Sequence, residues 1–407
     1  MFDYFREYFD IKAFALCLAL VAIGLLSVYS ATFDAHAGAI FQKQTNWAVV
    51  GLVVLIACAL FPFKLLQRVA VPVYALTLGA LFSVLIIGKT ISGSKSWFGL
   101  FDGSFGIQPS EFAKVATVLA LASFLSKTTV SVSATKHLLG TLALVFLPML
   151  FILAQPDLGT AVIFFVMLVP ILYWAGASNF VLAAIFAPIL VAGGALFGTT
   201  VFLVAIVASG FMLYLAHENR FAAGAVFGIT LALGLSVQTV YDNLAPYQQK
   251  RIATFLNPES DPLGAGYNVI QSKVAIGSGG LLGKGYLQGT QTQLNFIPEQ
   301  WTDFIFCVPG EEFGFAGAST VIILFALLLF HGIKTASLSK NKFGSVGAIG
   351  IVGVFGAHIF INIGMSLGLL PVIGIPLPFL SYGGSALVAN MAMVGLLMNF
   401  YANRKEH

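Results

Sequence analysis

The stretch IKAFALCLALVAIGLLSVYS, residues 11–30, decides the fold class of this chain. It contains one charged side chain, Lys12, and its length matches the roughly 20 apolar residues that a helix needs to cross a membrane. A cleavable signal peptide has an apolar region of only about 7–15 residues. We therefore expect residues 11–30 to form a permanent membrane-spanning helix.

The composition of the whole chain points to the same class. Of its 407 residues, 58% are hydrophobic and 9% are charged, whereas soluble domains carry about 25% charged residues. This excludes a cytosolic globular enzyme, a nucleic-acid-binding module and a disordered scaffold. The spacing of Cys17, Cys58 and Cys307 fits neither a metal site nor a disulfide framework, so we interpret them as packing residues.

Further apolar runs of similar length follow the first one. Backbone groups inside a bilayer must form their hydrogen bonds internally, so each run is expected to be a helix. The sequence thus predicts an all-α polytopic membrane protein of about 12 transmembrane helices in a single domain, residues 1–407. The other expected spans are residues 46–62, 69–88, 111–126, 138–154, 159–175, 179–197, 199–216, 222–240, 303–331, 346–368 and 383–402.

The distribution of Lys and Arg predicts the orientation. With the N-terminus inside, the outer short loops carry only Lys43, Lys89 and Lys95, and most other basic residues of short loops fall inside. Because cytoplasmic loops are enriched in Lys and Arg, both termini are expected to be cytoplasmic. Residues 241–302, before the tenth span, then form a large extracytoplasmic loop, and loops of that length are usually functional or disordered.

Ionisable residues within or beside spanning helices are costly and indicate function by default. The first cluster is Gln108-Pro109-Ser110-Glu111 with Lys114, where Glu111 and Lys114 share a helix face three residues apart. This spacing fits a structural ion pair and a functional site equally well. The second is the turn Gln155–Thr160 around Asp157, where turn chemistry alone explains Pro, Asp and Gly and favours a structural role.

The third cluster is the glycine-rich stretch 264–289. It superficially resembles a phosphate-binding loop, but Ser278 and Gly285 stand where that motif needs glycine and a hydroxyl residue. Nucleotide binding is therefore not expected. Lys273 and Lys284 could still meet a phosphate-bearing lipid headgroup as point charges.

The fourth cluster is PEQWTDFIF, residues 298–306. Asp303 lies where the outer segment enters a helix, between aromatic residues. A carboxylate there either complements the helix dipole or has the half-dry surroundings that a general base needs. Spacing alone leaves both readings open.

Six stretches resemble the SEDS family (shape, elongation, division and sporulation), and the long outer segment is most similar to its elongation branch. As they stand here, they read QPSEFAK (108–114), QPDLGT (155–160), NPESDPLGAGYNVIQSKVAIGSGGLLGKG (257–285), QTQLNFIPEQWTDFIF (291–306), GEEFGFAG (310–317) and NIGMSLGLLPVIGIPLPFLSYGGS (362–385). The resemblance implies a peptidoglycan glycosyltransferase of the bacterial cytoplasmic membrane that polymerises lipid II, the undecaprenyl-pyrophosphate-linked precursor, in cell elongation.

The resemblance also implies roles for single residues. It places the essential carboxylate on Asp303, as the general base that activates the acceptor 4-hydroxyl for one inverting displacement. Cationic groups or a divalent ion, Mg²⁺ or Mn²⁺, would stabilise the leaving pyrophosphate. The expected partners are lipid II, a class B penicillin-binding protein and the elongation machinery. The expected substrate-binding residues are Gln108, Glu111, Lys114, Asp157, Lys273, Lys284 and Glu299.

The chain departs from the family pattern at three points. Gly93–Trp97 has serine where the family has arginine before tryptophan, with Lys95 one position earlier, and a lysine does not copy a bidentate guanidinium. Trp301 replaces a histidine. The family has ten spans, so an extra helix pair is expected within residues 179–240.

Two other functions stay open at this stage. A lipid II flippase or another transporter would also have many spans with a few membrane acids, although transporters tend to show inverted repeats and broken helices at the midplane. A non-enzymatic scaffold for a penicillin-binding protein would tolerate replacement of Asp303.

Overall fold

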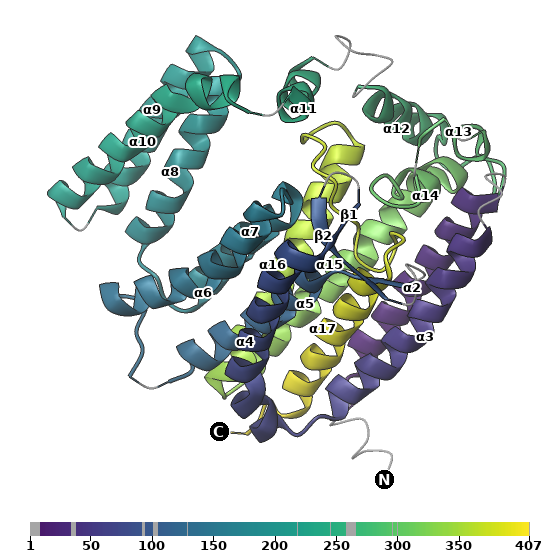
Figure 1. Cartoon of the computed structure of the whole chain (residues 1–407), viewed down its shortest axis with the longest axis horizontal. Helices are drawn as coiled ribbons and strands as arrows, with labels where there is room; N and C mark the ends of the chain where they lie inside the picture. Colours follow the sequence, from purple (N-terminus) through teal and green to yellow (C-terminus); the bar gives the residue numbers. More distant parts are fainter. Residues whose placement is uncertain are drawn as a thin grey trace. The chain divides into compact units, whose positions relative to one another are not determined.

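The computed structural model describes residues 9–33, 38–91, 94–100, 105–127, 129–217, 219–244, 246–257, 266–294, 296–298 and 300–406. The chain forms two compact units. Unit 1 comprises Met1–Ile171 and Tyr267–His407, and unit 2 comprises Leu172–Gly266. Figure 1 follows the chain through both units.

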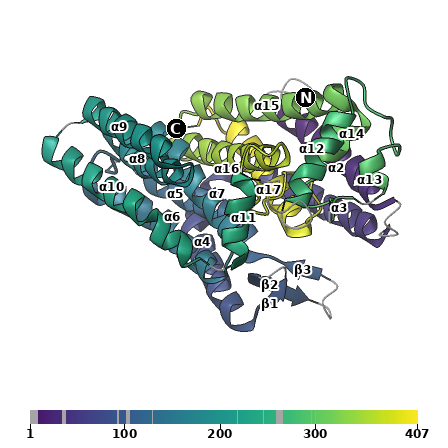
Figure 2. The ribbon, with the colours of Figure 1, turned by 90° about the horizontal axis from the view of Figure 1, so that it is seen from above.

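Unit 1 contains most of the secondary structure, including a small sheet (Figure 2). Its elements are α2 (Ile11–Phe33), α3 (Gly38–Leu60), α4 (Phe63–Ile87), β1 (Lys89–Ile91), β2 (Ser94–Leu100), β3 (Phe105–Ile107), α5 (Pro109–Leu125), α6 (Thr135–Ala154), α7 (Leu158–Trp174, whose end belongs to unit 2), α12 (Tyr267–Ser278), α13 (Thr290–Gln293), α14 (Cys307–Glu312), α15 (Gly314–Leu338), α16 (Lys342–Ser366) and α17 (Gly384–Ala402). Unit 2 contains α8 (Asn179–Leu196), α9 (Thr199–Ala216), α10 (Arg220–Asp242) and α11 (Pro246–Leu256).

The predicted multi-pass helical fold is confirmed. Every expected span overlaps a helix, and within the described residues 10 helices are long and apolar enough to cross a membrane, so the expected number of about 12 is not confirmed. The remaining two expected spans are α5 and α7, with 17 residues each. The protein is therefore a multi-pass membrane protein.

The span predicted at 303–331 has a different start in the structure. Residues 301–306 form turns, α14 is a short helix, and α15 begins only at Gly314. Gly314 has a φ of 62°, a left-handed conformation that breaks a right-handed helix and suits glycine. A Cβ there would lie 2.4 Å from the Gly283 nitrogen, so the break also admits the close approach of the outer segment.

Helices α16 and α17 form the core of unit 1. Their most apolar windows are 72% and 83% buried, more than those of the other long apolar helices. α16 packs against α5 and α15, and α17 packs along α3 (Figure 1). Glycine permits the second contact, because a Cβ on Gly395 would lie 2.3 Å from the Leu55 carbonyl oxygen. Small residues at such crossings let membrane helices approach closely.

The three strands between α4 and α5 are not predicted by the sequence analysis. They form an antiparallel sheet in the order β1-β2-β3, with Thr90 opposite Lys95 and Phe98 opposite Ile107. The Ser94 hydroxyl donates to the Gln155 carbonyl oxygen at 2.7 Å. The sheet is thereby tied to the turn that precedes α7.

α16 connects the two ends of unit 1. Near its start, the Lys340 nitrogen donates to the Arg404 carbonyl oxygen at 2.9 Å. Near its end, the Asn362 side chain donates to the Asp303 carbonyl oxygen at 2.8 Å. Asp303 therefore lies at the end of this helix opposite the C-terminal residues.

Candidate active site at the end of α16

Asn362 on α16 holds the backbone of Asp303. Its fully buried side-chain amide donates to the Asp303 carbonyl oxygen at 2.8 Å and to the Ile375 carbonyl oxygen at 2.7 Å. Phe304, the next residue, is buried in a cluster with Ala275 and Cys307. The position of Asp303 is thus fixed by its main chain and by its neighbour Phe304.

The Asp303 carboxylate lies half-buried beside Gly374. A Cβ on Gly374 would lie 3.4 Å from Asp303 Oδ2, and Gly374 has a φ of 73°. Only glycine takes this conformation without strain. The segment 373–376 is neither helix nor strand and forms one wall beside the carboxylate.

The predicted pair Glu111 and Lys114 is formed. Lys114 Nζ lies 2.9 Å from both carboxylate oxygens of Glu111 and 2.9 Å from His358 Nε2. His358 Nδ1 lies 3.0 Å from the Pro376 carbonyl oxygen. Lys114 is 0% exposed, and His358 links it to the segment 373–376. Direct contact of Lys114 or Glu111 with a substrate remains a prediction.

Asp157 caps the start of α7 and contacts Gln108. Its carboxylate accepts from the Thr160 nitrogen at 3.0 Å, the Thr160 hydroxyl at 2.8 Å and the Gln108 side-chain amide at 3.2 Å. A Cβ on the neighbouring Gly159 would lie 2.6 Å from the Ile373 carbonyl oxygen. The 155–160 turn therefore packs against the same 373–376 segment as Asp303.

The two predicted lysines of the outer segment have different surroundings. Lys273 is exposed on α12, and its Cδ would lie 3.2 Å from a Cβ on Gly368, just after α16. It has no ion-pair partner in the part of the chain that the structure describes. Lys284 instead pairs with Glu311 at 2.7 Å. Glu299 lies outside the described residues.

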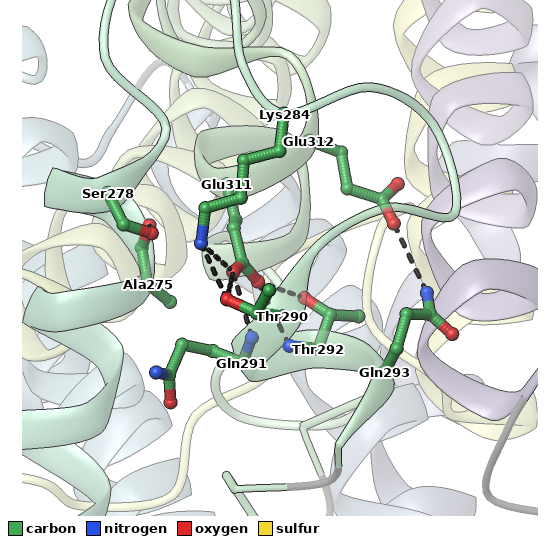
Figure 3. Close-up of polar contacts among 9 residues, drawn as sticks. All are labelled: Ala275, Ser278, Lys284, Thr290, Gln291, Thr292, Gln293, Glu311 and Glu312. Atoms are coloured by element: carbon green, nitrogen blue, oxygen red, sulfur yellow. Dashed lines mark hydrogen bonds and ion pairs between the residues drawn. The ribbon is translucent and has the colours of Figure 1, made fainter.

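Glu311 fastens residues 284–292 onto α14. Its carboxylate accepts from the Gln291 nitrogen at 2.8 Å and from the nitrogen and hydroxyl of Thr292 at 2.9 and 2.7 Å. The Lys284 ammonium and the Thr290 hydroxyl converge on the same carboxylate (Figure 3). This network gives Lys284 a structural role in addition to any role with a substrate.

The neighbouring Glu312 is equally buried but is held differently. Its carboxylate accepts from the Leu287 nitrogen at 3.1 Å, the Gln293 amide at 3.3 Å and the Ser30 hydroxyl. Burial raises the pKa of Glu312 above its ordinary value, and these hydrogen bonds only partly offset it. Burial also raises the pKa of Glu311, but the Lys284 ammonium and the bonds from Gln291 and Thr292 outweigh it and lower that pKa.

Replacement of each glutamate by glutamine is therefore expected to change the free energy of unfolding with opposite pH trends. Glu311→Gln should lower the free energy of unfolding by about 3 kcal/mol near neutral pH, because charged hydrogen bonds are lost. Since the folded-state pKa of Glu311 is lowered, this loss should shrink as the pH falls through that pKa. Glu312→Gln should lower the free energy of unfolding by less than Glu311→Gln does. Its deficit relative to wild type should shrink as the pH rises, because the wild-type protein must then ionise a buried carboxyl group.

Thermal unfolding of the two variants between acidic and neutral pH checks this prediction. The variants are matched, since the residues are adjacent and the substitutions are identical. Equal losses with the same pH trend would contradict it.

Among the described residues, no three His, Cys, Asp or Glu side chains form a group that could hold a metal ion. Mg²⁺ often binds through one or two carboxylates together with substrate phosphates. The expected divalent ion stays a prediction, in which the pyrophosphate would supply part of its ligands.

His358, Asn362 and Gly374 are not among the site residues predicted from the sequence. The first two are spaced four residues apart in an otherwise apolar span, which places them on one helix face. That pattern was a usable signal. Gly374 gave none, because its conformation is not visible in the sequence.

The comparison with known proteins decides the family. A family model described as cell cycle protein, for FtsW, RodA and SpoVE, matches residues 11–197 and 181–406. The chain belongs to this family. It is 36% identical to peptidoglycan glycosyltransferase RodA of Treponema pallidum, covering 97% of this chain and 98% of that protein. It is 35% identical to peptidoglycan glycosyltransferase MrdB of Escherichia coli K12, covering 98% and 95%.

Solved structures of this family have the same fold. One, described as "Structural coordination of polymerization and crosslinking by a peptidoglycan synthase complex", matches with a TM-score of 0.73 and 26% identity over 98% of this chain and 99% of the other. The Rod shape determining protein RodA of Thermus thermophilus matches with a TM-score of 0.64 and 24% identity, over 98% of each chain. The family resemblance inferred from the motifs is confirmed.

Proposed function

We propose that this protein polymerises lipid II into β-1,4 glycan strands at the outer face of the cytoplasmic membrane, with Asp303 as general base. The predicted activity class, peptidoglycan glycosyltransferase, is the one that the full-length relatives are named for. One observation carries the assignment of the base. The half-buried carboxylate of Asp303 lies beside the backbone of Gly374, and Asn362 holds the main chain of Asp303 in place.

The proposed reaction is a single displacement. The Asp303 carboxylate takes the proton of the acceptor sugar 4-hydroxyl while that oxygen attacks the anomeric carbon of the donor. The bond from this carbon to the pyrophosphate oxygen breaks, and undecaprenyl pyrophosphate leaves with the bonding electron pair. An α-linked donor therefore gives a β-linked product. A positioned base typically contributes about 10²–10⁴-fold to such a step.

Lys273 is the best candidate to meet the pyrophosphate. It is exposed near the end of α16 that carries Asn362. Lys284 is less suitable because Glu311 already neutralises it. Lys273→Gln should raise the KM for lipid II by about five- to tenfold with kcat within about twofold, because a phosphate contact already exists in the ground state.

Steady-state kinetics with lipid II tests the role of Lys273. Lys334→Gln is the matched control, since Lys334 is an exposed lysine near the opposite end of unit 1, on α15. An unchanged KM for the Lys273 variant would contradict the assignment.

The proposal also covers orientation and partners. Both termini are assigned to the cytoplasm, because most Lys and Arg residues of the short loops fall on the same side of the predicted topology as the termini and cytoplasmic loops are enriched in them. Asp303 then faces the outside. A class B penicillin-binding protein is the proposed partner, in keeping with the complex for polymerization and crosslinking that this fold matches.

Reconstitution in proteoliposomes with labelled lipid II tests the proposed activity. Glycan strands resolved on a gel are the expected product of the wild-type protein with its penicillin-binding partner. Movement of lipid II across the bilayer without strands would instead show a flippase. If the protein neither made glycan strands nor moved lipid II, it would act as a scaffold.

A further inference from the structure

His358 has partners for both nitrogens of its ring. Nε2 lies 2.9 Å from Lys114 Nζ, and Nδ1 lies 3.0 Å from the Pro376 carbonyl oxygen. The residue is 2% exposed and lies within the membrane-spanning helix α16. Its contacts therefore join the buried Glu111–Lys114 pair to the wall of the candidate active site.

The chemistry of the two partners fixes the tautomer of the ring. An ammonium group has only donors, so Nε2 must accept a hydrogen from Lys114. A carbonyl oxygen only accepts, so Nδ1 must carry the hydrogen and donate it to Pro376. A neutral ring with this single tautomer satisfies both contacts. It also adds no charge to a buried site where Glu111 and Lys114 already neutralise each other.

Side chains of α16 bind two carbonyl groups of segment 373–376. The segment has no helical or strand hydrogen bonds of its own, and buried carbonyl groups need a hydrogen-bond partner. Asn362 donates a hydrogen bond to the Ile375 carbonyl oxygen, and His358 donates one to the next carbonyl oxygen, that of Pro376. These two residues lie one turn apart on α16 and together place Gly374 against Asp303.

We propose that His358 is a positioning residue for glycosyl transfer, which holds Pro376 and thereby keeps Gly374 against the Asp303 carboxylate. Lys114 acts on the ring from the other side and keeps the Nδ1 hydrogen directed at Pro376. This inference rests on the proposed function, because it takes Asp303 as the base. It assigns a role to a residue that contacts neither lipid II nor the reacting atoms.

Two substitutions separate the two contacts of the ring. The amide nitrogen of asparagine occupies roughly the place of Nδ1, so His358→Asn keeps the donor to Pro376 and loses the acceptor for Lys114. The amide of glutamine reaches the place of Nε2, so His358→Gln keeps an acceptor for Lys114 and loses the donor to Pro376. Small misplacements of a catalytic group cost up to about 10²-fold in rate.

The expected result is a split between the two variants. His358→Gln should lower kcat for lipid II polymerisation by about tenfold or more, with KM within about twofold of wild type. His358→Asn should keep kcat within about threefold even where its thermal stability is lower. Phe360→Leu is the matched control, because Phe360 is 72% exposed on the same helix. It should leave kcat and KM unchanged.

Hydrogen exchange of segment 373–376 supplies a readout that does not depend on activity. The amides of Ile373, Gly374 and Ile375 should exchange faster in His358→Gln than in His358→Asn. Equal loss of kcat in both variants, or faster exchange throughout α5 and α16 as well, would reduce His358 to a structural residue and overturn the proposal.

An unchanged kcat in a folded His358→Gln variant would also overturn it. If the wild-type protein made no strands, the proposed function would fail and the role in glycosyl transfer with it. The exchange difference would then still decide separately whether His358 holds the segment.

Discussion

Asp303→Asn is expected to lower kcat for lipid II polymerisation by about 10²–10⁴-fold, the usual contribution of a positioned general base. Asparagine has nearly the same size and keeps a hydrogen-bonding oxygen, but it cannot take the proton of the acceptor hydroxyl. The bond from Asn362 goes to the main chain of residue 303, so the backbone should stay in place. The rate of strand formation in proteoliposomes, with lipid II above KM, measures the effect.

Two further variants make the Asp303 result specific. Asp303→Glu keeps a carboxylate but moves it by one methylene, so its loss should be smaller than that of asparagine. Asp242→Asn is the control, because Asp242 is exposed at the end of α10 and its carboxylate accepts from the Gln238 side-chain amide at 3.0 Å. Its kcat should equal that of wild type. Wild-type kcat in Asp303→Asn would remove Asp303 from the mechanism.

The second large effect is expected for Lys114→Met. Removal of one partner from a buried ion pair leaves an uncompensated charge and typically costs about 3–5 kcal/mol of stability. Here Glu111 would keep its charge with its ion-pair partner gone, and His358 would lose the donor that fixes its tautomer. Thermal unfolding in detergent, compared with wild type, measures the loss.

The double variant Glu111→Gln with Lys114→Met is the control for that loss. It removes both charges, so it should recover most of the stability that the single variant loses, since a buried pair is often replaceable by uncharged residues. Its kcat should stay below that of wild type, because without the Lys114 ammonium the His358 ring no longer has a single tautomer with the hydrogen on Nδ1. A single variant as stable as wild type would contradict the buried pair.

Much of the fold could be read from the sequence because hydropathy is a local property. Runs such as 11–30 and 346–368 are long enough to cross a bilayer, and helices α2 and α16 cover them. The β1–β3 sheet could not be predicted from the sequence, because its strands are short and because Ser94 is fixed by a contact with the distant residue 155. The helix break at Gly314 could not be predicted either, because it depends on the close approach of Gly283 from another segment.

The candidate site shows the same division between local and distant contacts. Glu111 and Lys114 are three residues apart, so their pairing followed from helix geometry alone. Turn chemistry likewise predicts a structural role for Asp157, which caps α7 through the Thr160 nitrogen. The pairing of Lys284 with Glu311 joins residues 27 positions apart, and no local pattern announces it.

The contacts of α16 are the least predictable from the sequence. Asn362 meets Asp303 across 59 positions, and Lys114 meets His358 across 244. Their spacing on one helix face indicates a common surface, but the partner on the other side depends on how the helices pack. Site residues that act through such contacts need the structure.

A single-turnover reaction with labelled lipid II tests the central claim most directly. Wild type and Asp303→Asn are reconstituted with the penicillin-binding partner, and bound lipid II and glycan product are both quantified. We predict equal binding, with product formed by wild type and almost none by the variant. Product formation by the variant at the wild-type rate would contradict the assignment of Asp303 as the base.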